Sequence, residues 1–219
     1  MYVDSHQHFW KLSRGDYSWM SNEYTALFRD FSTDDLKPLI NQKNISKTII
    51  VQAADTISES EFILDIASKT EFVTGVVGWV DFENKNVKND IDKLSDNSYL
   101  KGFRPMIHDI EDINWMLKKE LEDGLEYIKN KNLTFDALVR PQHLENLLIF
   151  AKKYHNLPIV IDHIAKPKII DGEIYKWKND MKNLSELENV FCKYSGILTE
   201  VGDNYTKEQI TPYINFIFE

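Results

Sequence analysis

The sequence predicts an α/β fold in which strands and helices alternate along the whole chain. Two observations carry this prediction: short apolar runs alternate with amphipathic stretches, and some of the runs are apolar throughout. The runs at 48–51 and 158–161 read Thr-Ile-Ile-Val and Pro-Ile-Val-Ile. Strands with two apolar faces are typical of a parallel sheet covered by helices. The alternation fits a doubly wound sheet or a (β/α)8 barrel and does not separate them.

Seven segments are predicted as strands. They are residues 2–4, 48–52, 72–80, 100–104, 133–140, 158–162 and 190–198. Two of the intervening helices start at predicted capping boxes, Ser58 with Glu61 and Thr206 with Gln209. The others are predicted from apolar residues at helical spacing over 87–94, 113–128, 144–151 and 177–187. We expect one domain over residues 1–219, with seven strand signals where a barrel has eight.

Charge and hydropathy exclude several partners. The chain has 26 Lys+Arg against 35 Asp+Glu and a formal net charge of -9, so no nucleic-acid surface is expected. No apolar run approaches the roughly 20 residues that span a bilayer, and the first residues lack a basic segment followed by an apolar one. We therefore expect a cytoplasmic protein without a membrane partner.

Residue content also excludes several chemistries. Cys192 is the only cysteine, which rules out an intrachain disulfide and a cysteine-cluster zinc site, and its apolar surroundings in the sequence predict a core position. The glycine-rich phosphate loops of dinucleotide and nucleotide-triphosphate enzymes are absent, as is the G-x-S-x-G turn of serine hydrolases.

A histidine pair follows the first predicted strand, in Asp4-Ser5-His6-Gln7-His8. Alternate strand residues point to the same side, so His6 and His8 are expected to project together. Two such imidazoles can ligate one divalent metal or hydrogen-bond a substrate. The alternative is a solvent-exposed N-terminal pair, but the pair precedes Phe9-Trp10, which we expect to be buried.

Other predicted strands also end in candidate site residues. His163 follows the sixth strand beside Asp162, and we expect it to act with the first histidine pair in catalysis. Arg104 and Arg140 each end a strand before a proline. A guanidinium there can clamp a carboxylate or polarise an acyl oxygen, whereas a lone arginine would more simply form a structural salt bridge. His143 is a further candidate for substrate binding.

Taken together, these motifs resemble the amidohydrolase-2 branch of the amidohydrolase superfamily, which includes sugar lactonases of the L-fuconolactonase and L-rhamnonolactonase type. The phrases that carry the resemblance are D-S-H-Q-H-F-W (4–10), V-Q-A (51–53), G-V-V-G-W-V-D (75–81), K-G-F-R-P (101–105), L-V-R-P-Q-H-L (138–144), V-I-D-H-I-A-K-P (160–167) and S-G-I-L-T-E (195–200). They cover essentially the whole chain. The resemblance implies a (β/α)8 TIM barrel, which we expect to be truncated here to about seven strands.

The resemblance also implies a reaction, the hydrolysis of a sugar-acid lactone. By motif, His6 and His8 would hold a divalent metal, zinc or similar, that some members of the branch need and others do without. His163 would be the sixth-strand catalytic histidine, and Arg104 and Arg140 would contact the substrate. Lactone hydrolysis needs an activated water and a polarised acyl oxygen, and either a metal or an Arg/His cluster can polarise that oxygen.

The sequence departs from the family pattern at the last strand. Members carry a phrase like F-G-S-D-W-P there, whose Asp activates the water, and this sequence reaches Glu219 without one. We therefore expect impaired catalysis and self-association through exposed barrel edges. Two alternatives stay open: a decarboxylase or hydratase of the same fold, and a catalytically inert truncated fragment.

Overall fold

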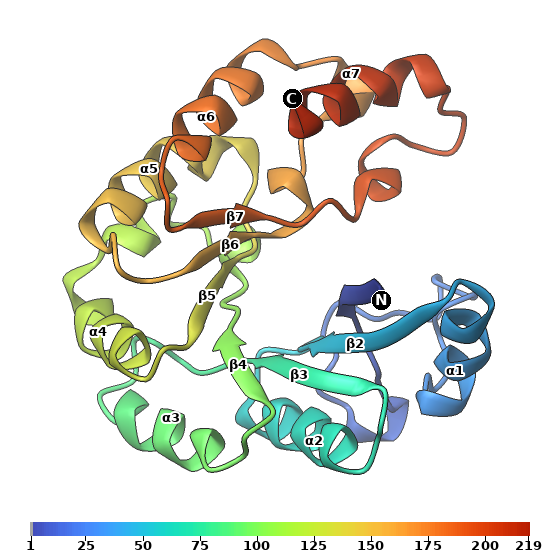
Figure 1. The fold of residues 1–219 in the computed structure, drawn as a ribbon, viewed down its shortest axis with the longest axis vertical. Helices are drawn as coiled ribbons and strands as arrows, with labels where there is room; N and C mark the ends of the chain where they lie inside the picture. The colour runs from blue at the N-terminus through green and yellow to red at the C-terminus, as the bar shows by residue number, and fades with distance from the viewer. Residues whose placement is uncertain (1) are drawn as a thin grey trace. The chain divides into compact units, whose positions relative to one another are not determined.

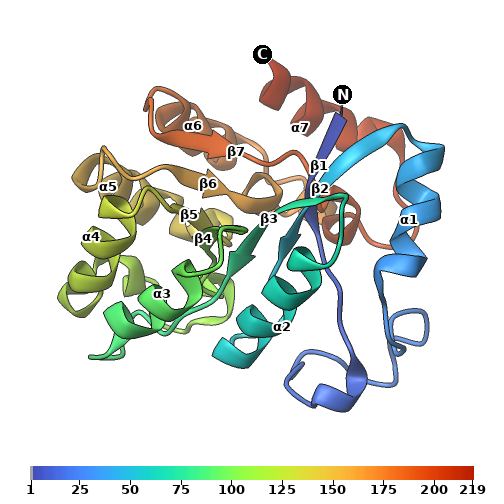
Figure 2. The same cartoon turned by 60° about the horizontal axis from the view of Figure 1, so that its bottom comes forward.

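The computed structural model describes residues 2–219, and the chain divides into two compact units, Met1–Pro105 and Met106–Glu219. Each unit has a parallel sheet with helices packed against it (Figures 1 and 2). None of the helices within residues 2–219 is long and apolar enough to cross a membrane. The prediction of a single domain over the whole chain stays a prediction.

The first unit contains four strands in the order β1-β2-β3-β4. They are β1 (Tyr2–Gln7), β2 (Ile45–Val51), β3 (Val73–Gly78) and β4 (Leu100–Phe103). Its helices are α1 (Thr33–Gln42), α2 (Ile57–Ser68), α3 (Val87–Ser95) and the short 3-10 helix η1 (Leu12–Arg14). α1 packs along β2 and α2 along β3. Ile50, Val51 and Val76 are buried, as expected for strands that are apolar on both faces.

The second unit contains three strands in the order β5-β6-β7. They are β5 (Thr134–Ala137), β6 (Ile159–Ile161) and β7 (Val190–Cys192). Its α-helices are α4 (Glu122–Asn130), α5 (Leu144–Lys153), α6 (Tyr175–Ser185) and α7 (Lys207–Phe218). Its 3-10 helices are η2 (Ile107–Asp109), η3 (Trp115–Leu117), η4 (Lys119–Leu121), η5 (Pro141–His143), η6 (Asp162–Ala165), η7 (Ile169–Asp171) and η8 (Ile197–Glu200). α4 packs against β5 and α6 against β7.

Two predicted helix starts were wrong, whereas the starts of α3 at Val87, of α5 at Leu144 and of α7 after Thr206 are confirmed. α2 begins two residues earlier than expected, because Thr56 and not Ser58 is the N-cap, with its Oγ1 accepting a hydrogen bond from the Glu59 amide at 3.0 Å. The helix expected over 113–128 begins only at Glu122, because Lys118 adopts an extended conformation that separates two 3-10 turns. The capping box of Thr206 and Gln209 is confirmed at the start of α7.

The strand order begins at β1 and ends at β7, and side chains of these two strands are exposed. Tyr2 is 71% exposed and Phe191 56%. Cys192 is exposed as well, so the predicted core position was wrong: an end strand leaves its side chains less covered than a central one. Self-association through these edges stays a prediction, which size-exclusion chromatography at several protein concentrations tests.

Candidate functional site

The structure brings His6 and His8 together at the end of β1. Their Nε2 atoms lie 3.2 Å apart, and the two rings meet edge to face with centroids 4.9 Å apart. The local strand is not regular, because its register with β2 shifts between Asp4 and Gln7. The carboxylate of Asp4 accepts a hydrogen bond from the His6 backbone N–H at 3.0 Å. A register irregularity of this kind re-aims side chains and is common beside active sites.

The tautomer of His8 follows from its hydrogen bond to β2. The Nδ1 atom lies 2.7 Å from the carbonyl oxygen of Val51, and a carbonyl can only accept, so Nδ1–H is the donor. In a neutral imidazole the lone pair then lies on Nε2. His8 therefore presents a basic nitrogen to His6, and that nitrogen can accept a proton or bind a cation.

Arg104 follows β4 directly and is only 3% exposed. Its Nη2 donates a hydrogen bond to the carbonyl oxygen of Gln52, and the Gln52 side-chain amide donates back to the Arg104 carbonyl at 2.9 Å. The Nη1 atom of Arg104 lies 3.4 Å from Nε2 of His6. Strands β1, β2 and β4 thus converge on one cluster of two imidazoles and a guanidinium, and the candidate residues His6, His8 and Arg104 lie within it.

The histidine pair fits two positions of a zinc site. Two nitrogens each about 2.0–2.1 Å from a tetrahedral zinc lie about 3.3 Å apart, close to the 3.2 Å found here. The hydrogen bond from His8 to Val51 also matches the usual second-shell support of a ligating imidazole. The nearby Arg104 guanidinium adds positive charge, which reduces the attraction of the pair for a divalent cation.

His163, in the second unit, stands on an unusual backbone. Residues 163–166 all have positive φ, with values of 52° at His163, 49° at Ile164, 62° at Ala165 and 47° at Lys166. L-residues visit this left-handed region singly at a cost of about 1–2 kcal/mol each, and a β-branched residue such as Ile164 is a particular outlier there. Strain of this kind is concentrated at functional sites, which favours a functional role for His163.

Gly196 and Ser195 fix the ring of His163. Ser195 Oγ lies 2.8 Å from Nδ1 of His163. A Cβ on Gly196 would lie 2.6 Å from the same nitrogen, closer than real contacts allow, and Gly196 itself has a φ of 64°. Glycine is thus required at position 196 both by its backbone conformation and by the approach of the imidazole.

A buried ion cluster lies next to His163. Lys193, which follows β7, is 2.5 Å from Asp136 of β5 and 3.1 Å from Asp162 at the end of β6. Although burial alone would lower it, the two carboxylates raise the pKa of Lys193 above its ordinary value, so the amine is held as a cation. Thr134 Oγ1 donates to Asp136 at 2.9 Å. The cluster joins β5, β6 and β7 beside the turn that carries His163.

His143 and Arg140 are joined by a local backbone bond. The Arg140 N–H donates to Nδ1 of His143 at 3.1 Å, and the imidazole is buried. Burial lowers the pKa of His143, so the ring is neutral and uses Nδ1 as an acceptor. This arrangement gives His143 a role in the turn at η5. The roles of His143 and Arg140 in substrate binding stay predictions.

Some residues of these clusters were missed by sequence reasoning. Gln52, Asp136 and Lys193 are polar residues within or at the end of apolar strands, and that pattern is the signal that could have identified them. Ser195 lies in a phrase that carried the family resemblance but was not assigned a role. Nothing in the sequence spacing indicated the left-handed turn at 163–166.

The comparisons with known proteins support the predicted fold and class. The family described as Amidohydrolase matches residues 3–219. The L-fucono-1,5-lactonase of Burkholderia ambifaria is 39% identical over 215 residues, which is 98% of this chain and 74% of that protein. The L-fucono-1,5-lactonase of Burkholderia multivorans is 28% identical over 204 residues, 90% of this chain and 69% of that protein.

Solved structures agree with this placement. A zinc-bound crystal structure of an amidohydrolase from Burkholderia multivorans superposes with a TM-score of 0.91 at 26% identity, covering 100% of this chain and 78% of that one. A TIM-barrel protein from Bordetella bronchiseptica has a TM-score of 0.60 at 8% identity, over 91% of this chain and 76% of that one, and supports the fold alone. The predicted barrel-type α/β fold with seven parallel strands is confirmed. The chain belongs to the amidohydrolase family and is a hydrolase.

Proposed function

We propose that the protein hydrolyses a sugar-acid lactone, with L-fucono-1,5-lactone as the first substrate to test. The observation that carries this proposal is the cluster of His6, His8 and Arg104, in which two imidazole nitrogens and a buried guanidinium meet at the strand ends of the first unit. The two relatives named L-fucono-1,5-lactonase support the choice of substrate.

The proposed reaction opens the lactone ring. A water oxygen forms a bond to the acyl carbon, the bond from that carbon to the ring oxygen breaks, and the ring oxygen takes a proton, which gives a hydroxy acid. Negative charge develops on the acyl oxygen on the way, and Arg104 stabilises it by donated hydrogen bonds. His8 has its lone pair on Nε2 and serves as the base that takes the proton from water.

We assign supporting roles to the other candidate residues. His163, whose Nδ1 lies 2.8 Å from Ser195 Oγ, donates a proton to the ring oxygen as the lactone opens. The proton that His8 took from water leaves to solvent and His163 takes up a new one, so both rings regain their starting state. Arg140 and His143 bind hydroxyl oxygens of the substrate. His6 and His8 are also the residues that would hold a divalent metal, zinc or a similar ion. With Nε2 of His8 bound to the ion, His8 would no longer act as the base, and the ion would itself supply the polarisation of the acyl oxygen and the activation of water.

The test is a hydrolysis assay on a panel of aldonolactones. Each turnover releases one acid, so a pH indicator in weak buffer follows the reaction, and proton NMR identifies the product. We expect hydrolysis of at least one six-carbon lactone above the spontaneous rate, measured with and without added zinc. A folded protein that opens no lactone under either condition, or that releases CO2 from a carboxylated substrate, would overturn the proposal.

The metal assignment has a separate binding test. Isothermal titration calorimetry of the protein with zinc is compared with the same titration of His8→Ala. We expect the substitution to weaken zinc binding more than tenfold, because loss of a group that merely supports a ligand already costs about 10–100-fold in affinity. Equal affinity in the two proteins would remove His8 from the proposed ligand set.

A further inference from the structure

One peptide group links the Arg104 cluster to a buried carboxylate on α2. The carbonyl oxygen of Gln52 accepts a hydrogen bond from the Arg104 guanidinium. The N–H of Ala53, which belongs to the same planar peptide group, donates to Oε1 of Glu59 at 3.0 Å. The peptide is therefore held between a cation at its oxygen and a carboxylate at its nitrogen.

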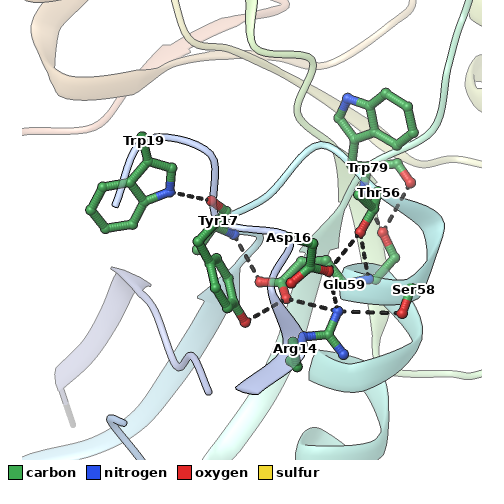
Figure 3. A network of polar contacts seen from close by, with 10 residues as sticks. Arg14, Asp16, Tyr17, Trp19, Thr56, Ser58, Glu59 and Trp79 are labelled. Atoms are coloured by element: carbon green, nitrogen blue, oxygen red, sulfur yellow. Dashed lines mark hydrogen bonds and ion pairs between the residues drawn. The ribbon is translucent and has the colours of Figure 1, made fainter. Parts of the chain in front are cut away.

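Both carboxylate oxygens of Glu59 have polar partners. Its side chain is fully buried, its second oxygen accepts from the hydroxyl of Tyr17 at 3.0 Å, and the Arg14 guanidinium lies 3.5 Å away (Figure 3). Thr56 caps the helix at the Glu59 amide. Burial raises the pKa of this carboxyl, against the lowering effect of the hydrogen bonds from Ala53 and Tyr17.

The orientation of the Gln52–Ala53 peptide group positions one end of the Arg104 guanidinium. Rotation of this peptide group would move the carbonyl oxygen that accepts the hydrogen bond from Nη2 of Arg104. An acceptor at the N–H end opposes this rotation, and a charged acceptor polarises the peptide and strengthens the hydrogen bond at its oxygen. A carboxylate in this position therefore orients the guanidinium without touching it.

We propose that Glu59 is a positioning residue for Arg104, acting through the Gln52–Ala53 peptide group. The proposal rests on the proposed function in that Arg104 is taken to contact the reacting acyl oxygen. Sequence reasoning gave Glu59 no role, and the residue lies outside the histidine and arginine motifs.

The network around Glu59 also offers a purely structural role. Arg14, Tyr17 and Trp19 belong to the segment after β1, and the Trp19 indole donates to the Ala53 carbonyl at 2.7 Å (Figure 3). Glu59 thereby anchors that segment to α2. The matched control is Tyr17→Phe, which removes the hydrogen bond that the hydroxyl donates to Glu59 and leaves the one that the Ala53 amide donates to Glu59 in place.

The first test uses Glu59→Gln, which keeps an oxygen for the Ala53 amide and removes the charge. We expect kcat for lactone hydrolysis to fall about tenfold with KM changed less than twofold, a fraction of the 10²–10³ lost when a whole oxyanion donor is removed. Tyr17→Phe is expected to stay within twofold of the native kcat. In an Arg104→Lys background, Glu59→Gln is expected to have no further effect on kcat.

The second test needs no turnover and separates this proposal from the proposed function. The guanidinium Nε–H resonance of Arg104, assigned by its loss in Arg104→Lys, is recorded by ¹H–¹⁵N NMR for the native protein and both variants. We expect Glu59→Gln to shift or broaden this resonance and Tyr17→Phe to leave it in place. If no lactone is hydrolysed but the resonance responds in this way, the positioning stands and the proposed function fails.

The contrary results are equally definite. Equal losses of kcat in Glu59→Gln and Tyr17→Phe would show that Glu59 only anchors the segment after β1. An unchanged Arg104 resonance in Glu59→Gln, with the melting temperature showing a folded protein, would also overturn the proposal.

Discussion

His8 and His163 are both strand-end histidines, yet the chain holds them in different ways. His8 follows a β-strand, and a hydrogen bond to the neighbouring strand at Val51 orients its ring. His163 starts a run of four left-handed residues. Its ring is fixed by Ser195 and packs directly against Gly196, where a side chain would clash with it. The first histidine is positioned by ordinary strand pairing and the second by backbone strain that its surroundings must offset.

The strained backbone around His163 has to be stabilised by contacts that the strand end at His8 does not need. The turn at 163–166 is supported by a hydrogen bond from the Ile164 amide to the Lys193 carbonyl at 3.1 Å and by one from the Trp177 indole to the Ile164 carbonyl at 2.8 Å. Lys193 also holds the two buried carboxylates. Substitutions near His163 should therefore change stability and activity together, whereas those at His8 should change activity alone.

Lys193→Met should have the largest effect. It leaves Asp136 and Asp162 buried without this cation, and removing one partner of a buried ion pair costs about 3–5 kcal/mol. Urea unfolding at pH 7 measures the loss. Asp136→Asn in the same chain should recover part of it, since one of the stranded charges is then gone. If Lys193→Met unfolds at the native urea midpoint, the cluster does not support the turn.

His8→Ala should lower kcat by about 10²–10⁴-fold, the usual range for a general acid or base, with little change in the free energy of unfolding because the ring is only half-buried. The matched control is Gln7→Ala. Its side chain donates to Thr48 at 3.2 Å, away from the histidine pair, so this variant should lose stability and retain kcat. If His8→Ala lost stability and retained kcat while Gln7→Ala lost kcat, the assignment of His8 to the catalytic side of the strand would be contradicted.

Gly196→Ala should reduce kcat/KM about a hundredfold, because the new Cβ displaces the ring of His163. Gly172→Ala provides the control in the same unit. Gly172 has a similar φ of 69°, but its Cβ would meet nothing within 4 Å. Both substitutions should cost about 1–2 kcal/mol of stability for the left-handed backbone, and Gly196→Ala should cost more because its Cβ meets His163. Only Gly196→Ala should impair catalysis. Equal kcat/KM values in the two variants would show that His163 takes no part in the reaction.

The smallest expected effect concerns His143, the last residue of η5. Its pKa is lowered by burial, so the folded protein does not take up the proton that the unfolded chain binds below pH 6.5. The stability that His143 contributes is therefore present above pH 6.5 and is lost as the pH falls through the folded pKa. His143→Gln keeps an acceptor for the Arg140 amide and should reduce this pH dependence, because the titrating ring is gone. Unfolding free energies from pH 8 to pH 5.5 that run parallel in both proteins would show that the ring titrates normally.

The sequence predicted those parts of the molecule that follow from local periodicity. The apolar strands, the capping box at Thr206 and the convergence of His6 with His8 depend on the alternation of side chains along a strand or helix. The Thr56 cap was missed because Ser58 with Glu61 offers the same signature two residues later. The left-handed turn at His163 was missed because Ile164, Ala165 and Lys166 do not favour positive φ. Tertiary contacts from Lys193, Ser195 and Trp177 impose it.

The most direct measurement of the account is kcat/KM for L-fucono-1,5-lactone in the native protein and in Arg104→Lys. Lysine retains the charge but loses the fork of donors that reaches both Gln52 and His6. We expect hydrolysis by the native protein and a loss of about a hundredfold in the variant, at a similar KM and with both proteins folded. Equal kcat/KM in the two proteins would contradict the central claim that the strand-end cluster around Arg104 performs the reaction.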